Sequence, residues 1–222
     1  MGHVGLWVRC RRRYCPSCAA ARARQQKARI RERLQEALAR GGAAAFLTLN
    51  TAMDLTLGLQ DRITKLLAQF SRIRNRRAWR SPERGYQAHL GLVFALEIGG
   101  EHPLGHPHLH ILLWGQDPAE VMAAGLWLKQ AWCGVDPEAQ PWLQRLERVE
   151  PTWESLDRIS AYVTKGTQIS MAWPEALILA VVQELSSGRR HLIRCGRALP
   201  RRSRPMAVVA DSGPWASWGF TG

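Results

Sequence analysis

Residues 105–115, GHPHLHILLWG, alternate polar and apolar side chains with the two-residue period of a β-strand. In such a strand His108 and His110 point to one side of a sheet, whereas Leu109, Ile111 and Leu113 point to the other. Two neutral imidazoles this close together suit a divalent metal ion, although they could also line a solvated strand face. The stretch therefore predicts a strand with one buried face and a candidate metal-binding pair on the other.

The sequence on either side of this strand predicts an alternation of strands and helices. Strands are indicated by short apolar and β-branched runs, and helices by strong helix formers with apolar residues three and four apart. The predicted strands are 44–50, 86–99, 106–115 and 141–151. The predicted helices are 19–40, 57–79, 118–134 and 152–168, the last with Thr152 as its N-cap. A further helix is predicted at 173–188 and a short strand at 189–196.

From residue 44 onward, the predicted order is strand, helix, strand, strand, helix, strand. This is the split βαβ arrangement of ferredoxin-like domains, an α+β fold. Because strands joined by hairpins pair antiparallel, we expect a central antiparallel sheet, with its helices on one face.

The charge of the chain is unusual. Its 31 Lys and Arg residues outnumber 18 Asp and Glu residues, which gives a net charge of +13. So large a surplus favours a polyanionic partner such as nucleic acid. No apolar run is long enough to cross a membrane, and the basic N-terminus lacks an apolar signal region. We therefore expect a cytoplasmic, nucleic-acid-binding protein without a membrane partner.

Three cysteines are crowded near the N-terminus. Cys10, Cys15 and Cys18 are separated by four and then two residues. This spacing favours a structural zinc site, for which His3 is the nearby candidate for a fourth ligand. A redox pair or unconnected thiols are the alternatives. Because zinc would order a segment rich in arginine, we expect the segment to present cations to DNA phosphates.

Candidate DNA-binding arginines occur in two clusters. One lies among these cysteines, and the other lies on the basic outer face of the helix predicted at 57–79 and just after it. They are Arg11, Arg12, Arg13, Arg74, Arg76 and Arg77.

A candidate nucleophile lies in the helix predicted at 152–168. Tyr162 has Lys165 three residues further on, and therefore on the same helix face. Alone, Tyr162 could be a core aromatic. Together with a metal that polarises a phosphodiester, a tyrosine hydroxyl that attacks it and a lysine that offsets its charge make a DNA-nicking site.

At this point the sequence resembles a known family, the tyrosine-dependent HUH endonucleases, and among them the small plasmid rolling-circle replication initiators. Four stretches carry the resemblance in the family's order. They are CRRRYCPSCAAAR from residue 10, FLTLN from 46, GHPHLHILL from 105 and AYVTKG from 161. The stretches GLWLKQAW and GRRHLIRCG also resemble the family, so the likeness extends over roughly residues 10–196.

The resemblance implies a metal-dependent endonuclease. His108 and His110 would be metal ligands, Glu97 in the preceding strand would be the third, and the metal would be Mn²⁺ or Mg²⁺. Tyr162 would form a 5′-phosphotyrosine link and free a 3′-hydroxyl to prime synthesis. The implied partners are single-stranded or hairpin origin DNA, a host helicase and a host polymerase.

One position departs from the family. Initiators of this type often carry a glutamate one helical turn before the tyrosine, and here that residue is Arg158. The resemblance therefore supports nicking better than a particular mode of termination. An HUH transposase of the same chemistry, or a catalytically silent zinc-bearing DNA-binding protein, is the alternative. Relaxases, which use the same chemistry, usually carry the tyrosine before the histidines in the sequence. Here Tyr162 follows His108 and His110, which argues against a relaxase.

These motifs divide the chain into three parts. We expect residues 1–40 to form a zinc knuckle and a basic helix, and 41–200 to form the endonuclease domain. Residues 201–222 are expected to be a basic, flexible tail.

Overall fold

The computed structural model describes residues 16–52, 54, 56–99, 106–136, 138–165 and 193–195. Within these ranges, the side chains of residues 16–20, 22, 165 and 193–195 lie outside the description. The helices of more than one turn are α1 (Pro16–Ala39), α2 (Leu59–Arg74), α5 (Pro118–Val135) and α6 (Trp153–Lys165). The strands are β1 (Ala43–Asn50), β2 (Gly91–Gly99), β3 (His106–Gly115), β4 (Arg145–Arg148) and β5 (Ile193–Cys195).

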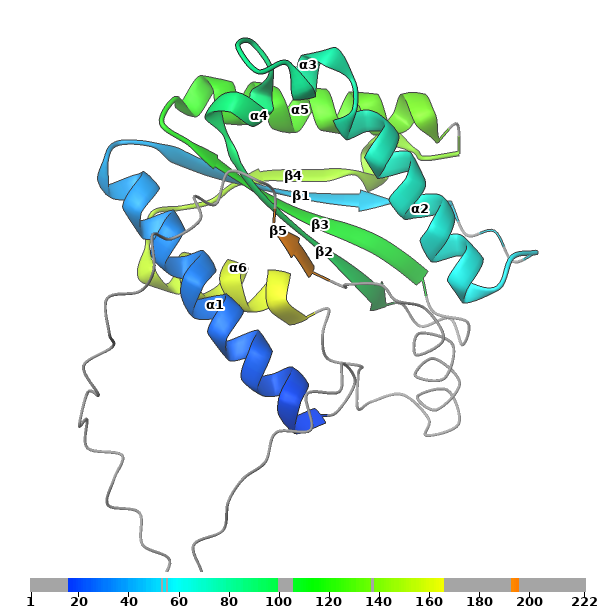
Figure 1. Cartoon of the computed structure of the whole chain (residues 1–222), viewed down its shortest axis with the longest axis horizontal. Helices are drawn as coiled ribbons and strands as arrows, with labels where there is room; N and C mark the ends of the chain where they lie inside the picture. The colour runs from blue at the N-terminus through cyan, green and yellow to red at the C-terminus, as the bar shows by residue number, and fades with distance from the viewer. Residues whose placement is uncertain are drawn as a thin grey trace, which may run out of the picture.

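The strands form one antiparallel sheet with the order β4-β1-β3-β2-β5. α2 connects β1 to β2, and α5 connects β3 to β4 (Figure 1). This connectivity gives the spatial order 4-1-3-2 for the first four strands, which confirms the predicted split βαβ arrangement. The strand predicted at 106–115 lies at the centre of the sheet, between β1 and β2.

Helices cover both faces of the sheet, not one face as we expected. α2 and α5 lie on one side and α1 and α6 on the other (Figure 1). Each face has its own buried cluster, one containing Leu47 and Leu49, and the other containing Phe46. The reason is the composition of β1: its residues are apolar on both sides of the pleat, so both faces must be covered.

The cluster under α1 and α6 extends into both helices. Leu34 of α1 and Val163 of α6 are fully buried. At its C-terminal end, α1 turns into β1 through Gly41, whose φ of 80° is accessible to glycine without strain. The backbone N–H of Gly42 closes the turn by donating to the Ala37 carbonyl. α1 is thus part of the same packed unit as the sheet.

Three of the predicted elements each combine two elements of the structure. The helix predicted at 57–79 ends at Arg74, and a short helix α3 (Arg77–Arg80) follows it. The strand predicted from residue 86 begins at Gly91, because Tyr86–His89 forms a helical turn, α4. Both differences place side chains in one aromatic cluster. Trp79 and Tyr86 pack against each other and against Trp127 of α5, with ring centroids 5.8–6.2 Å apart.

The third difference is the edge strand. Residues 141–151 were predicted as one strand, but Pro141–Leu143 is a 3₁₀ turn, η1, and only Arg145–Arg148 pairs with β1. The start of α6 agrees with prediction, since the Thr152 hydroxyl accepts from the Ser155 backbone N–H at 3.2 Å. The helix predicted at 173–188 lies outside the described residues.

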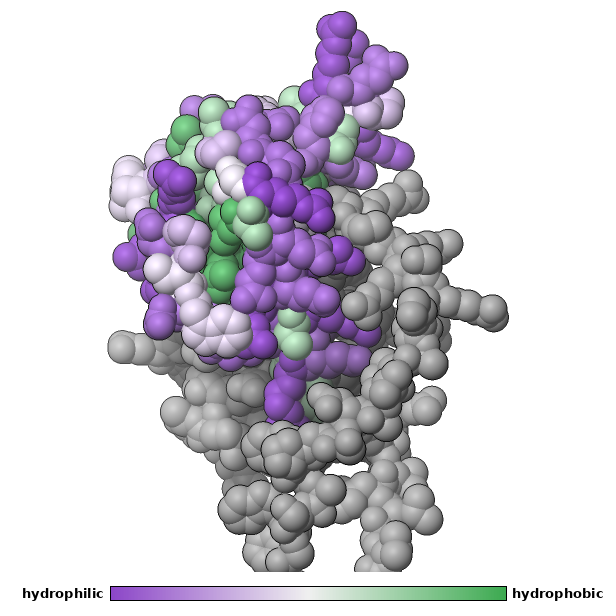
Figure 2. All heavy atoms as spheres, turned by 90° about the vertical axis from the view of Figure 1, so that its left-hand side faces the viewer, coloured by the Kyte–Doolittle hydropathy of each residue, from purple (hydrophilic) through white to green (hydrophobic). Residues whose placement is uncertain are grey.

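Hydrophilic side chains cover much of the described surface. Figure 2 shows the side of the molecule that lies to the left in Figure 1, with a smaller apolar region among the hydrophilic residues. A hollow of about 370 Å³ lies where α1 ends and β2 begins, with Arg33, Arg40, Gln87 and Trp114 in its lining. In the described part of the chain, no helix is both long and apolar enough to span a membrane.

Candidate metal centre and its tyrosine

Two neighbouring strands bring a carboxylate and two imidazoles together. In the β2–β3 register Glu97 lies directly opposite His108, and His110 follows two residues later on the same face. The Nε2 atoms of His108 and His110 lie 3.2 and 2.5 Å from Oε2 of Glu97. All three ligand atoms lie within 4.8 Å of one another, which is a spacing that could hold a metal ion. The structure thus brings together the three side chains that the sequence proposed as ligands.

The hydrogen bond on the far side of the His108 ring fixes its neutral tautomer. Its Nδ1 lies 3.1 Å from the backbone carbonyl of His106. A carbonyl can only accept, so Nδ1 must carry the proton, and Nε2 of the neutral ring then faces Glu97 with a lone pair. A lone pair and a carboxylate oxygen repel each other unless a proton or a metal cation lies between them. The arrangement therefore suits a cation bound by these side chains.

His110 is held in a similar way and is more deeply buried. Its Nδ1 lies 3.2 Å from the Thr48 hydroxyl, and only 2% of the residue is exposed. The ring also stacks on Phe46, with centroids 5.5 Å apart and an interplanar angle of 11°. Thr48 lies directly opposite His110 in the β1–β3 register, so β1 provides both contacts. These contacts orient Nε2 toward Glu97.

The three side chains are also coupled electrostatically. Burial alone would raise the pKa of Glu97, but the contacts of its carboxylate with the His108 and His110 rings outweigh burial and hold that pKa well below its usual range. Burial lowers the pKa of the adjacent His106, against a hydrogen bond to the Thr51 carbonyl that favours its protonation. Glu97 is therefore a carboxylate, as a metal ligand must be.

Tyr162, in helix α6, contacts this group of side chains. Its ring meets the His110 ring edge to face, with centroids 4.8 Å apart, and the Phe46 ring at 5.7 Å. The side chain is 40% exposed, so the ring packs on the histidine while part of it remains accessible to solvent. Lys165 is the last residue of α6, and its side chain lies outside the described residues.

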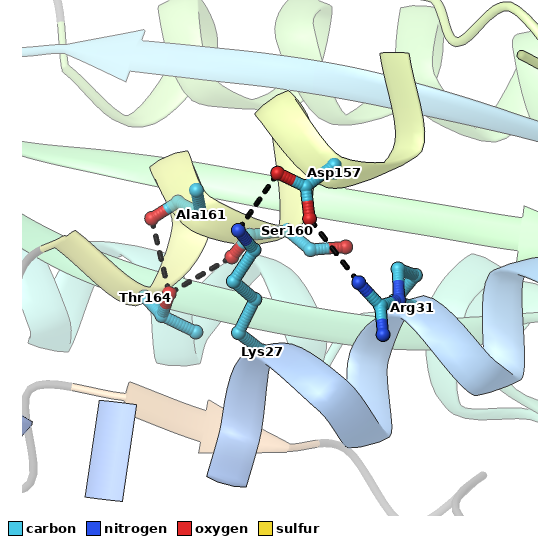
Figure 3. A network of polar contacts seen from close by, with 6 residues as sticks. All are labelled: Lys27, Arg31, Asp157, Ser160, Ala161 and Thr164. Atoms are coloured by element: carbon cyan, nitrogen blue, oxygen red, sulfur yellow. Dashed lines mark hydrogen bonds and ion pairs between the residues drawn. The ribbon is translucent and has the colours of Figure 1, made fainter. Parts of the chain in front are cut away.

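Two basic side chains of α1 hold α6 in place (Figure 3). Lys27 Nζ and Arg31 Nη1 donate to the two oxygens of Asp157, at 2.8 and 3.2 Å. Two residues after Tyr162, the Thr164 hydroxyl donates within α6 to the carbonyls of Ser160 and Ala161. The position of α6 over the histidines thus depends on α1 as well as on the sheet.

A family of known proteins includes this sequence. A family model described as "Replication protein" matches residues 6–120, more than half of the chain. The chain belongs to this family. The match includes Glu97, His108 and His110, and it ends before α6, which carries Tyr162. No curated protein and no solved structure matches the chain significantly.

Family membership confirms the resemblance to plasmid replication initiators. For a replication protein, a carboxylate and two histidines facing a tyrosine is a chemically suitable arrangement. The zinc site and tyrosine nicking stay predictions. Of the proposed zinc ligands, His3, Cys10 and Cys15 lie outside the described residues, as does the side chain of Cys18.

The candidate DNA-binding arginines are not part of this group of side chains. Arg11, Arg12 and Arg13 lie outside the described residues. Arg74 lies over the rings of Phe70 and Phe94, which belong to the core cluster on the opposite face of the sheet. Arg76 and Arg77 follow it, are exposed, and lead into α3. Any DNA contact made by Arg74, Arg76 or Arg77 would be separate from the metal centre.

The residues that orient the site could not be predicted from the sequence. Thr48 and Phe46 lie in the FLTLN stretch, but a period of two alone does not say which strand lies beside β3. Lys27 and Arg31 read as ordinary basic residues of an exposed helix face. Their partner, Asp157, is more than 120 residues away in the chain. No local pattern signals a contact of that range.

Proposed function

We propose that this replication protein initiates plasmid rolling-circle replication by nicking single-stranded origin DNA with Tyr162. The observation that carries the proposal is the contact between the Tyr162 ring and His110, a member of the Glu97–His108–His110 group. A tyrosine in contact with a suitable metal centre is what a phosphodiester-cleaving site of this type needs.

Glu97, His108 and His110 would hold the metal through one oxygen and two Nε2 atoms. Three ligands leave coordination positions open, and the donor set accepts Mn²⁺ or Mg²⁺. When bound, the ion would polarise the scissile phosphate and stabilise the departing 3′-oxygen. Thr48 and the His106 carbonyl keep the two rings oriented toward Glu97, where the ion would bind.

The nicking step is a transesterification. The Tyr162 hydroxyl oxygen bonds to phosphorus and loses its proton, while the bond from phosphorus to the 3′-oxygen breaks and that oxygen gains a proton. The products are a 5′-phosphotyrosine and a free 3′-hydroxyl. An ordinary tyrosine pKa near 10 makes the neutral phenol a weak nucleophile. Lys165, three residues after Tyr162 in the sequence, would offset negative charge on the phosphate.

Hydrolysis of the covalent link needs a base to activate water, and the carboxylates near Tyr162 are poorly placed for this role. Arg158 occupies the position one turn before Tyr162, and Asp157 beside it is paired with Lys27 and Arg31. We therefore propose that attack by an incoming 3′-hydroxyl, which reverses the nicking step, releases the protein faster than hydrolysis does. A host polymerase would extend the freed 3′-hydroxyl, and a host helicase would unwind the duplex.

The test is a covalent-trapping experiment. The protein is incubated with labelled single-stranded origin DNA and Mn²⁺, and then denatured and separated on a gel. We expect a labelled band at the mass of the protein plus DNA. Tyr162→Phe, which keeps the ring and removes only the hydroxyl, should abolish that band, whereas the control Tyr86→Phe should keep it. A band that survives Tyr162→Phe would refute the proposed nucleophile.

A further inference from the structure

An unusually exposed tryptophan lies at the edge of the sheet. Trp142, in η1 just before β4, is 77% exposed, more than the other large hydrophobic side chains that the described surface exposes. The next residue, Leu143, is 50% exposed. The pair offers an apolar surface that the described part of the fold does not cover.

Hydrogen bonds fasten this segment to the end of β1. Asn50 donates from its side-chain amide to the Leu143 carbonyl at 2.6 Å, and from its backbone N–H to the Gln144 side chain at 2.7 Å. Gln144 in turn donates to the Asn50 carbonyl at 3.2 Å, as does the indole of Trp132 at 2.8 Å. Trp142 is therefore presented from a well-anchored turn.

The anchor lies beside the metal centre. Asn50 is directly opposite His108, which is opposite Glu97, so these three form one row across the sheet. Arg145 is directly opposite Thr48, which is opposite His110, and they form the adjacent row. Directly opposed residues point to the same face. At about 4.8 Å per strand, Arg145 begins roughly 10 Å from His110 on the face that carries the metal centre.

The combination suits one kind of ligand. An exposed aromatic ring stacks with an unpaired base, and an exposed arginine such as Arg145 binds a phosphate of the same strand. A duplex would keep its bases stacked inside and offer no open base face to the tryptophan ring. We propose that Trp142 and Arg145 form a platform at the β4 edge for single-stranded DNA next to the scissile phosphate. This inference rests on the proposed function.

The test measures binding without cleavage, in the Tyr162→Phe background with the metal removed by chelation. Two probes of equal length, roughly twenty nucleotides, carry the same phosphates: an oligothymidylate and an oligomer of abasic sites. Trp142→Ala should weaken binding of the oligothymidylate about tenfold, the effect of losing one base stack. It should leave binding of the abasic oligomer unchanged. Trp142→Phe, which keeps a ring, should retain most of the affinity and so excludes a folding defect.

Two further variants complete the test. Trp153→Ala removes another exposed tryptophan, the first residue of α6, whose ring contacts Arg31 of α1, and should leave binding of both probes unchanged. Arg145→Gln should weaken binding of both probes equally and reduce the slope of log affinity against log salt by about 0.7. The inference is wrong if Trp142→Ala affects both probes alike or neither. If the parent protein binds no single strand at all, the proposed function fails as well.

Discussion

At the scale of single residues, the chemistry of the site follows from which nitrogen of the His108 imidazole carries a proton. The His106 carbonyl can only accept from His108, so the other ring nitrogen of the neutral side chain faces Glu97 without a proton. Glu97 has a depressed pKa and carries a negative charge. Two acceptors held this close need a proton or a metal cation between them, which is the physical basis for treating these residues as candidate metal ligands.

The first prediction concerns Glu97. Replacing it with glutamine keeps the size of the side chain but removes the charge that attracts a cation. We expect Glu97→Gln to weaken Mn²⁺ binding by more than about tenfold, since even the loss of a residue that only supports a ligand costs that much. Isothermal titration with Mn²⁺ measures the change, and Glu83→Gln, an exposed carboxylate between α3 and α4, is the control. Equal Mn²⁺ affinities for the two variants would show that Glu97 is not a metal ligand.

At the scale of elements, the sheet presents the metal ligands while two helices determine where the tyrosine lies. α6 packs through Leu156, Ile159 and Val163 onto the same cluster as Phe46. The ion pairs from Lys27 and Arg31 to Asp157 join α6 to α1. Because α1 begins at Pro16, between Cys15 and Cys18, the cysteine-rich segment is continuous with the helix that holds α6 in place.

The second prediction is a pH dependence that comes from Asp157. Its hydrogen bond with Lys27, above all, lowers its pKa below the ordinary value of 3.8, and Arg31 contributes further. A group whose pKa is lowered on folding stabilises the fold above its unfolded pKa, and this stabilisation is lost as the pH falls through the folded pKa.

We therefore expect Asp157→Asn to unfold at a lower temperature than the parent protein at neutral pH. The difference should shrink once the pH falls below 3.8. Thermal unfolding followed by circular dichroism at several pH values measures it. Glu150→Gln, an exposed carboxylate outside the helix, serves as control. A difference that stays constant into acid would show that the ion pairs do not stabilise α6.

Elements with a clear period could be predicted, and those shaped by distant contacts could not. The alternation in residues 106–115 gave β3 with its observed bounds. The turn at Tyr86–His89 was missed, because Tyr86 packs on Trp79 and Trp127 and not within the sheet. The helix break at Asn75 has the same origin, since the break lets Trp79 turn inward.

At the scale of the whole molecule, the order of the elements predicted the topology of the sheet but not its layers. A sheet open on one face needs polar residues on alternate positions of its central strands. β1, AAAFLTLN, has none before Thr48, and that threonine bonds His110 at the end of the sheet where the metal centre lies. The apolar residues on both faces required a second helical layer, and that layer is what brings Tyr162 to the histidines.

The third prediction concerns the N-terminal cysteines. If Cys10, Cys15 and Cys18 bind zinc, the purified, reduced protein should contain about one zinc ion per chain, the stoichiometry of a tetrahedral structural site. Cys15→Ser should lose that zinc and bind DNA more weakly, while Mn²⁺ binding at Glu97 is retained. Elemental analysis gives the zinc content, and Cys133→Ser, a cysteine in α5, is the control. Absence of zinc from the parent protein would refute this part of the proposal.

The most direct measurement is the site of covalent attachment. After reaction with single-stranded origin DNA and Mn²⁺, the DNA is digested to a short remnant, and mass spectrometry locates it in the protein. We predict that the remnant is attached through a 5′-phosphate to Tyr162, and that chelation of the metal prevents its formation. Attachment to Tyr14 or Tyr86, or no covalent link under conditions where the DNA is cut, would contradict the proposed mechanism.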